Sequence, residues 1–424
     1  MVFATDQRRN RGRAAGFYQY VFGMLRNMPS MQRSLLLLML GLPATASAVI
    51  GTLDPVPAAT VLIPYFEADL AANNFPNGRR DTTINVSNAT AAAALTSVTV
   101  WSDLGVPVVH FNLALAGHGS AAFSLRAVLT GTLPSSSAAS PTCVGHLPPP
   151  APSAGTLTSW KNALSGLPAS LFASKCVGRL IDDRFVRGYV TIDVVKSCAD
   201  TTPADASYFM GLAADDNVLL ATFSTLEGDD NSSSGELAVH LEASSSSPAT
   251  TTSGQATFYG RVLGWSAKDH REPLATHWHA TVVANDSELI VWRDPQKPGA
   301  AFTCGTPPAP LAQETLVAFD TDGQPMDLKA SRAVGAVAQA VPVGPDLMGT
   351  NPGESLRVMA KKGFIIFSSN LPGSTAGPST DKTTGQSYVW VRRAPDQGVG
   401  RFGTGTRATQ LDSATAPSHA LVVQ

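Results

Sequence analysis

The sequence predicts an all-β protein with two antiparallel β-sandwich domains, immunoglobulin-like or jelly-roll-like, and a Pro/Ser-rich insertion tied by disulfides. Apolar and polar residues alternate with a period of two rather than the helical period of about 3.6. The alternating runs are rich in Val, Thr, Ile and aromatic residues, and Gly, Pro, Asn, Asp and Ser separate them. About 375 residues follow the N-terminal leader, which is more than one hydrophobic core normally serves.

The clearest strand is VPVVHFNLAL at residues 106–115. Val109 and Phe111 share one face while His110 and Asn112 share the other, as a half-buried strand requires. The same alternation recurs almost to the C-terminus. It is found in TTINVSN, LTSVTVW, VRGYVTIDVV, GQATFYGRVLGW, HWHATVVA, SELIVWRD, ETLVAFD, KKGFIIFSSN and SYVWVRR.

Residues 130–180 interrupt this alternation and form the expected insertion. PSSSAASPTCVGHLPPPAPSAG is rich in Pro, Ser and Ala, a composition that predicts an exposed loop. In the following TLTSWKNALSG, Leu157, Trp160 and Leu164 have the spacing of one helical face, and Gly166 is expected to end the helix. The strand VRGYVTIDVV is then expected to close the first sandwich.

The polar segment SCADTTPADAS marks the expected boundary between the two domains. The first sandwich is therefore predicted at residues 49–200 and the second at residues 201–394. GDDNSSSGE and ASSSSPATTTSG are typical of hairpin or loop tips in the second domain. Residues 395–424 are rich in Gly, Thr and Ala and predict a flexible tail.

Residues 31–48 have the pattern of a secretory signal peptide. Arg33 precedes the apolar run 35–42, and the small residues 44–48 contain an Ala-x-Ala cleavage site. The apolar run is much shorter than the roughly 20 residues that span a bilayer. We therefore expect cleavage after Ala48 and a secreted, periplasmic or cell-surface location without a transmembrane anchor.

Residues 1–30 carry five arginines, which are typical of a long basic leader or a nucleic-acid-binding tail. An ordinary signal peptide begins close to its charge, so we favour translation from Met24, Met28 or Met31. Residues 1–48 hold six Lys or Arg and one acidic residue, so their removal changes the net charge from −2 to −7. Because nucleic-acid binding calls for a basic patch, this charge argues against a nucleic-acid partner.

The chain has four cysteines, an even number that predicts two disulfides in an exported protein. Three pairings are compatible with four cysteines. We expect Cys143 to pair with Cys176 and Cys198 with Cys304, because the first bond closes the Pro-rich excursion on itself. A zinc site is the alternative, and the absence of CxxC or paired Cys/His spacing argues against it.

Several short motifs resemble those of one protein family. PYFE, SDLGVP, RGYVTID, FYGR, REPL and VWRD lie within residues 58–320, and over most of this span the chain resembles an uncharacterised family of exported bacterial β-rich proteins. The resemblance implies export. It implies no catalytic residue, because no activity is established for that family.

DHREPLATHWH is the segment most suggestive of metal binding. On a strand, His277 and His279 project from one face, as metal-binding His-x-His pairs do. The alternative is that Trp278 lies on the buried face and both histidines face water. We favour this alternative, because the spacing assigns no third ligand.

Acidic loops are candidate calcium sites. DTDGQPMD offers Asp320, Asp322 and Asp327. EGDDNSSSGE offers Glu227, Asp229, Asp230, Asn231 and Glu236. Neither segment has the twelve-residue EF-hand spacing, and Asp, Asn and Gly are also favoured in turns. No cofactor is therefore predicted, and calcium held by loop acids is the alternative.

Common catalytic motifs are absent from the sequence, which lacks GxSxG, HExxH and GxxxxGK[ST]. The SxxK at Ser379 lies in PSTDKTTG, a predicted surface loop. A glycosidase needs only two placed carboxylates, and Asp182, Asp183 and Asp193 flank RGYVTID. We favour a solvated position for these acids.

The segment PYFEADL is a candidate recognition surface, with Tyr65 and Phe66 beside Glu67 and Asp69. We favour the alternative in which this strand packs its rings inward and shows its acids to solvent, because large aromatic residues are highly buried on average.

These observations predict an exported binding, surface or matrix-associated protein with an unknown extracellular or cell-surface ligand, a glycan being one candidate. The alternative is an extracytoplasmic glycan-directed hydrolase with unassigned carboxylates. A binding protein is expected to show a ligand-sized groove without converging buried acids. An enzyme is expected to show a concave site that contains perturbed titratable groups.

Overall fold

In the computed structural model, the described residues all lie within the unit Ile50–Gln424. The expected signal peptide and everything else before residue 56 lie outside the described residues. The structure describes residues 56–70, 80–140, 143–181, 185–198, 200–205, 207–227, 232–244, 257–260, 269–275, 277–283, 287–293, 300–308, 315–326, 336–343, 362–368, 386–393, 405–407 and 409–410.

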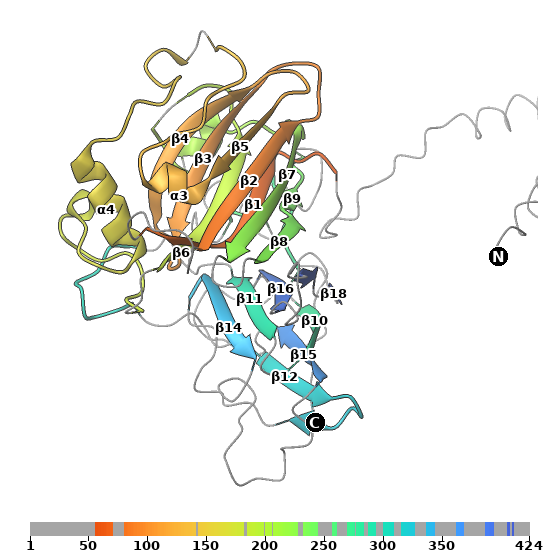
Figure 1. Ribbon diagram of the computed structural model, residues 1–424. Coiled ribbons are helices and arrows are strands. Elements are labelled where there is room, and N and C mark those ends of the chain that lie inside the picture. Colours follow the sequence, from red (N-terminus) through yellow and green to blue (C-terminus); the bar gives the residue numbers. More distant parts are fainter. Residues whose placement is uncertain are drawn as a thin grey trace, which may run out of the picture. The chain divides into compact units, whose positions relative to one another are not determined.

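Two antiparallel sheets form the first part of the fold (Figure 1). One has the order β4-β3-β6-β1-β9 and the other β5-β2-β7-β8. Apolar side chains of both sheets belong to one hydrophobic core. The strands are β1 Thr60–Asp69, β2 Arg80–Asn88, β3 Ala94–Ser102, β4 Pro107–Leu115, β5 Ser120–Ser124, β6 Phe185–Val194, β7 Leu219–Glu227, β8 Ser232–Leu237 and β9 Val239–Leu241.

Strand β2 shows the predicted period of two. Ile84 and Val86 are fully buried, whereas Thr83 and Asn85, which alternate with them, are exposed. Alternate side chains of a strand lie on opposite faces, so one face of β2 meets the core and the other meets solvent. Burial of each aliphatic side chain contributes about 1.5–3 kcal/mol to the free energy of unfolding.

Two further antiparallel sheets form the second part of the fold, in the orders β13-β12-β15-β10-β18 and β14-β11-β16-β17. Trp278 and Tyr388 pack edge to face here, with ring centroids 5.4 Å apart. The predicted all-β architecture is confirmed. The strands are β10 His277–Val282, β11 Ser287–Arg293, β12 Thr315–Asp320, β13 Pro325–Met326, β14 Ala338–Val343, β15 Gly363–Ser368, β16 Ser387–Arg393, β17 Gly405–Arg407 and β18 Thr409–Gln410.

The expected domain change at residue 200 does not coincide with a change of sheet. Strands β7, β8 and β9 follow residue 200, yet β7 pairs with β2 and β9 pairs with β1. The first pair of sheets therefore extends to Leu241. Near the C-terminus, β17 and β18 lie within the expected tail 395–424 but pair with β16 and β10.

The insertion contains the predicted short helix. Helix α4, Ala154–Leu164, buries Trp160 and Leu164, and the Ser153 hydroxyl caps it by accepting a hydrogen bond from the Thr156 amide at 3.1 Å. Gly166 follows with a φ of +72°, which glycine adopts without strain. The other short helices are α3 Leu125–Leu129, η2 Ser170–Phe172 and η3 Tyr208–Leu212. No helix among the described residues has the length and apolar character needed to cross a membrane.

All four cysteines are in disulfides, as predicted, but the predicted pairing is wrong. Cys143 bonds Cys198, and Cys176 bonds Cys304. The reason lies in the backbone around Cys176, which exchanges hydrogen bonds with Phe302 at 3.0 and 2.9 Å. The insertion is thus attached at two points to distant segments of the chain instead of being closed on itself.

Candidate functional site

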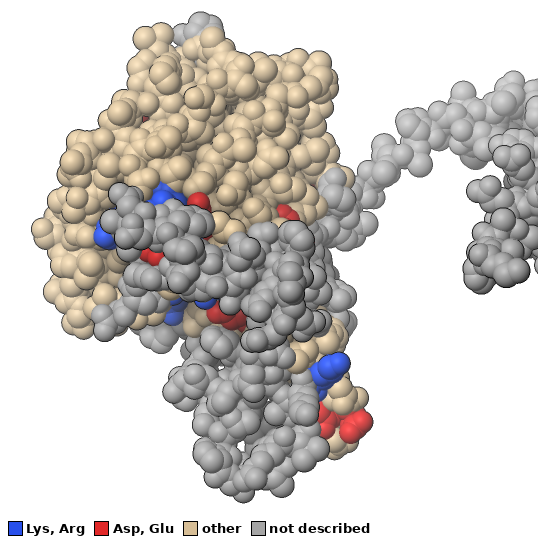
Figure 2. Space-filling model, viewed as in Figure 1, with Lys and Arg blue, Asp and Glu red and all other residues tan. Residues whose placement is uncertain are grey.

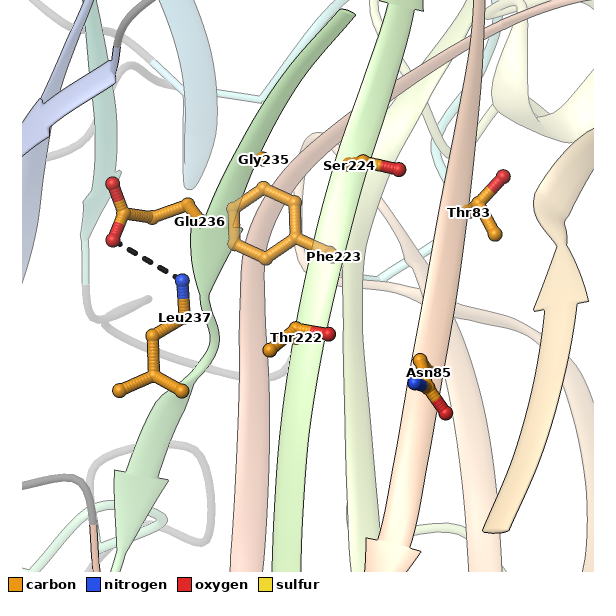
Figure 3. A pocket seen from close by; sticks show the side chains of 8 residues that line it. All are labelled: Thr83, Asn85, Thr222, Phe223, Ser224, Gly235, Glu236 and Leu237. Carbon is orange, nitrogen blue, oxygen red and sulfur yellow. Dashed lines mark hydrogen bonds between the residues drawn. The ribbon is translucent and has the colours of Figure 1, made fainter.

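The outer face of the sheet β5-β2-β7-β8 carries the candidate site. The register places Thr83 of β2 opposite Ser224 of β7, and Asn85 opposite Thr222. All four side chains point away from the core, because they alternate with buried residues. Figure 3 shows these hydroxyl and amide groups on two neighbouring strands.

Strand β8 completes a pocket of about 390 Å³ on this face. Gly235 pairs with Ser224, and a Cβ added at Gly235 would have Phe223 O and Ser224 Cβ as its nearest neighbours, both at 3.9 Å. The absence of a side chain at this glycine therefore leaves open space beside Ser224. The pocket is lined by Thr83, Asn85, Thr222, Phe223, Ser224, Gly235, Glu236 and Leu237.

Glu236 is the single carboxylate among these lining residues. Its Oε1 accepts a hydrogen bond from the Leu237 amide at 3.1 Å (Figure 3). A glycosidase of the usual kind uses two carboxyl groups about 5–10 Å apart. The described lining does not supply such a pair, whereas its hydroxyl and amide groups suit hydrogen bonding to a polar, uncharged ligand.

One long stretch of the first pair of sheets is poor in charge. Between Asp81 and Lys161 the sequence contains two charged residues, Asp103 and Arg126. Asp103 is buried and bonded to Arg179, with a nitrogen-oxygen distance of 2.6 Å. Figure 2 shows the result: most of the visible surface over the first pair of sheets carries neither acidic nor basic side chains.

The acids of PYFEADL are buried, so their predicted exposure is wrong. Glu67 is 2% exposed and lies 2.5 Å from Arg80, 3.0 Å from Arg187 and 3.5 Å from Arg392. Burial alone raises the pKa of Glu67, but the charges of these three arginines outweigh it and bring the pKa to about 2. The rings of PYFE are buried, as predicted.

Asp193 is likewise buried rather than solvated. Its Oδ1 accepts a hydrogen bond from the Thr60 hydroxyl at 2.5 Å, and its Oδ2 accepts one from the Tyr259 hydroxyl at 3.1 Å. The guanidinium of Arg271, itself buried, donates to the Thr60 hydroxyl at 3.0 Å. Burial raises the pKa of Asp193, and the charge of Arg271 opposes that effect.

Asp269, close to this cluster, is fully buried. Burial raises its pKa to about 6, while the charge of Arg271 and a hydrogen bond from the Tyr259 amide partly offset the shift. Glu67, Asp193 and Asp269 do not line the described pocket. Burial is the largest influence on the pKa of each of these three carboxyl groups, and the charge of at least one arginine opposes it.

The two histidines of HWHATV do not both face water, so the favoured interpretation is wrong for one of them. His277 is 2% exposed because β10 lies inside its sheet, between β15 and β18. His279 is half-buried, with its ring centroid 5.1 Å from that of Phe364. Trp278 is fully buried, as expected.

Asp320 and Asp322 form part of a turn. Oδ1 of Asp320 accepts hydrogen bonds from the amides of Asp322 and Gln324, at 2.9 and 2.8 Å. This arrangement is the local role expected of Asp at turns. Asp327, Asp182, Asp183 and Ser379 lie outside the described residues. Across the described part of the chain, no group of three or more His, Cys, Asp or Glu residues is arranged to hold a metal ion.

Of the residues that line the pocket, the sequence singled out only Glu236, as a candidate calcium ligand. TTINVSN was predicted as a strand with polar residues on one face, and such residues face solvent in most half-buried strands. GDDNSSSGE was predicted as a hairpin or loop tip, and its last residues belong to strand β8, Ser232–Leu237, which pairs antiparallel with β7. Comparison of the chain with known protein families, curated proteins and solved structures gives no match.

Proposed function

We propose that the chain is an exported protein that binds a neutral glycan in the groove of β2, β7 and β8. The observation that carries this proposal is the lining itself, in which hydroxyl and amide groups predominate and Glu236 is the single acid. The volume of about 390 Å³ lies within the range of roughly 300–1,000 Å³ that is usual for small-ligand sites. Membership of the exported bacterial family that the motifs resemble is part of the same proposal.

Neutral sugars fit this surface for a physical reason. Each sugar hydroxyl both donates and accepts hydrogen bonds, and so do Thr, Ser and Asn side chains. A charged ligand gains little from a region with so few charged residues, whereas a neutral one does not depend on ion pairs. Net gains of about 0.5–1.5 kcal/mol per hydrogen bond imply modest affinity for a single sugar and stronger retention of a polymer.

Replacing Gly235 with valine is expected to lower glycan affinity at least tenfold, about 1.4 kcal/mol. The new side chain enters the open space beside Ser224, and a β-branched residue suits strand geometry, so the melting temperature should stay unchanged. Affinity electrophoresis in gels containing soluble neutral glucans, mannans or galactans measures the effect.

Gly211→Val is the matched control, because that glycine also has open space around it and lies on η3, outside the groove. Retardation of the parent and of Gly211→Val, with loss in Gly235→Val, supports the site. Equal retardation of all three chains places binding elsewhere. Release of reducing sugar by the parent would contradict simple binding and favour a hydrolase.

Cleavage after Ala48 is expected when the chain is produced in an exporting host. The apolar run followed by an Ala-x-Ala site supports it, and the two disulfides are consistent with an oxidising compartment. N-terminal sequencing of the exported protein should begin at Val49. A sequence that begins upstream of Met31 would contradict the proposal.

A further inference from the structure

Exposed large apolar side chains are concentrated in the disulfide-tied insertion. Leu171 is 55% exposed and Leu180 is 65% exposed, and Leu167 and Ile181 are also exposed. Soluble proteins expose single apolar residues routinely, but a group of them in one segment marks an interaction surface. We call Leu167, Leu171, Leu180 and Ile181 the insertion patch.

The insertion carries the exposed Leu171 on a turn that is closed by hydrogen bonds. Ala173 and Ser174 have φ values of 54° and 59°, which turn the chain sharply after η2. The Ala169 amide donates to the Lys175 carbonyl at 3.1 Å, closing the tip, and the disulfide of Cys176 anchors its base. These contacts fix the backbone of the turn that carries the exposed Leu171 side chain.

A second contact positions the remaining members of the patch. A Cβ placed on Gly166 would lie 2.3 Å from the Arg179 carbonyl carbon and 2.4 Å from the Leu180 amide nitrogen, so these two backbone segments touch. Leu167 follows Gly166 directly in the chain, and Leu180 follows Arg179. The turn after α4 and the segment that ends at Ile181 therefore present apolar side chains from adjoining backbones.

Basic residues accompany the patch. Residues 154–181 contain Lys161, Lys175 and Arg179 and no acid. Arg179 is bonded to Asp103, whereas Lys161 and Lys175 have exposed side chains. The next acids in the sequence, Asp182 and Asp183, lie outside the described residues.

We infer that the insertion patch docks the protein on an anionic phospholipid surface. Aliphatic side chains on protruding turns, flanked by lysines, combine apolar insertion with attraction to negative headgroups. Protein-binding hot spots are instead enriched in Trp, Tyr and Arg and lie at the centre of well-packed interfaces. This inference is independent of the proposed glycan site.

The test is co-sedimentation of the full, disulfide-intact chain with vesicles of phosphatidylcholine, with and without phosphatidylglycerol. The parent should bind the anionic vesicles more strongly. The double variant Leu171→Ser/Leu180→Ser should lose about tenfold in binding for each leucine. The double variant Lys161→Glu/Lys175→Glu should lose at least about fivefold per lysine, on anionic vesicles only.

Leu226→Ser is the control, because Leu226 is an exposed leucine on β7, outside the patch. All variants are produced in the same exporting host, so the cleavage expected after Ala48 removes the apolar run 35–42 from each of them. Equal vesicle binding by the parent and the leucine double variant would overturn the inference. The inference would also be overturned if the parent did not bind vesicles and formed a dimer that the leucine double variant does not form. In that case the patch would join two copies of the chain.

Discussion

Replacing Glu67 with glutamine is expected to lower the free energy of unfolding by about 3–5 kcal/mol, as is usual when one partner of a buried ion pair is removed. The variant keeps the shape of the side chain but leaves Arg80, Arg187 and Arg392 without the carboxylate they surround. Urea unfolding at neutral pH measures the loss. The exposed turn residue provides the control: Asp322→Asn should change the free energy by less than about 0.5 kcal/mol. A loss below about 1 kcal/mol for Glu67→Gln would contradict this account.

The Glu67 carboxylate makes the free energy of unfolding depend on pH. Its native pKa of about 2 lies below its ordinary value of 4.5, so the unfolded chain binds the proton more readily. The contribution of Glu67 is therefore complete above about pH 4.5 and is lost as the pH falls from 4.5 to 2, by about 3 kcal/mol. Glu67→Gln should lack this part of the acid sensitivity.

Asp269 has the opposite effect on the pH dependence of the free energy of unfolding. Its native pKa of about 6 lies above its ordinary value of 3.8, so the native state binds the proton more readily. Its contribution to stability grows as the pH falls from 6 to 3.8 and is lost again as the pH rises through 6. Melting temperatures measured for Glu67→Gln and the parent at matched pH values separate the two effects.

Replacing Cys176 and Cys304 with serine is expected to lower the free energy of unfolding by about 4–5 kcal/mol. The disulfide spans 128 residues of sequence, so its loss frees a long loop in the unfolded chain. Chemical denaturation of the double variant measures the loss. The bond Cys143–Cys198 spans 55 residues and provides a comparison, with an expected loss of about 4 kcal/mol. A negligible loss for the longer bond would show that the insertion is held by other contacts.

The local fold was predictable from the sequence, because alternation depends only on neighbouring residues. Strand β2 and helix α4 appear where the pattern placed them. The pairing of β7 and β9 with β2 and β1 was not predictable, since it joins segments more than 100 residues apart. The disulfide partners failed for the same reason: Cys176 meets Cys304 through backbone contacts with a distant loop.

The buried charges show a second limit of the sequence pattern. All ten residues of β1, which lies between β6 and β9 in its sheet, are buried. Alternation assigns an acid on such a strand to solvent, whereas Glu67 is buried among arginines from positions 80, 187 and 392. A single sequence does not reveal which distant cation neutralises a given carboxylate.

The candidate site was predictable only in part. The outward direction of Thr83 and Asn85 follows from the alternation of β2, but their meeting with Thr222 and Ser224 depends on long-range pairing. Gly235 in a serine-rich segment has the composition of a loop, and its position in an edge strand became evident only in the folded chain. Uncharged polar residues also give no motif that distinguishes a binding face from ordinary solvated surface.

A glycan array probed at low and high ionic strength tests the central claim most directly. The array carries neutral and acidic glycans side by side, and reducing sugar is assayed in the same solutions. The account predicts retention of neutral glycans at both salt concentrations, loss of that retention in Gly235→Val, and no new reducing ends. Binding confined to acidic glycans and abolished by salt, or binding to no glycan at all, would contradict the claim that this groove, with its single carboxylate, is a neutral-glycan site.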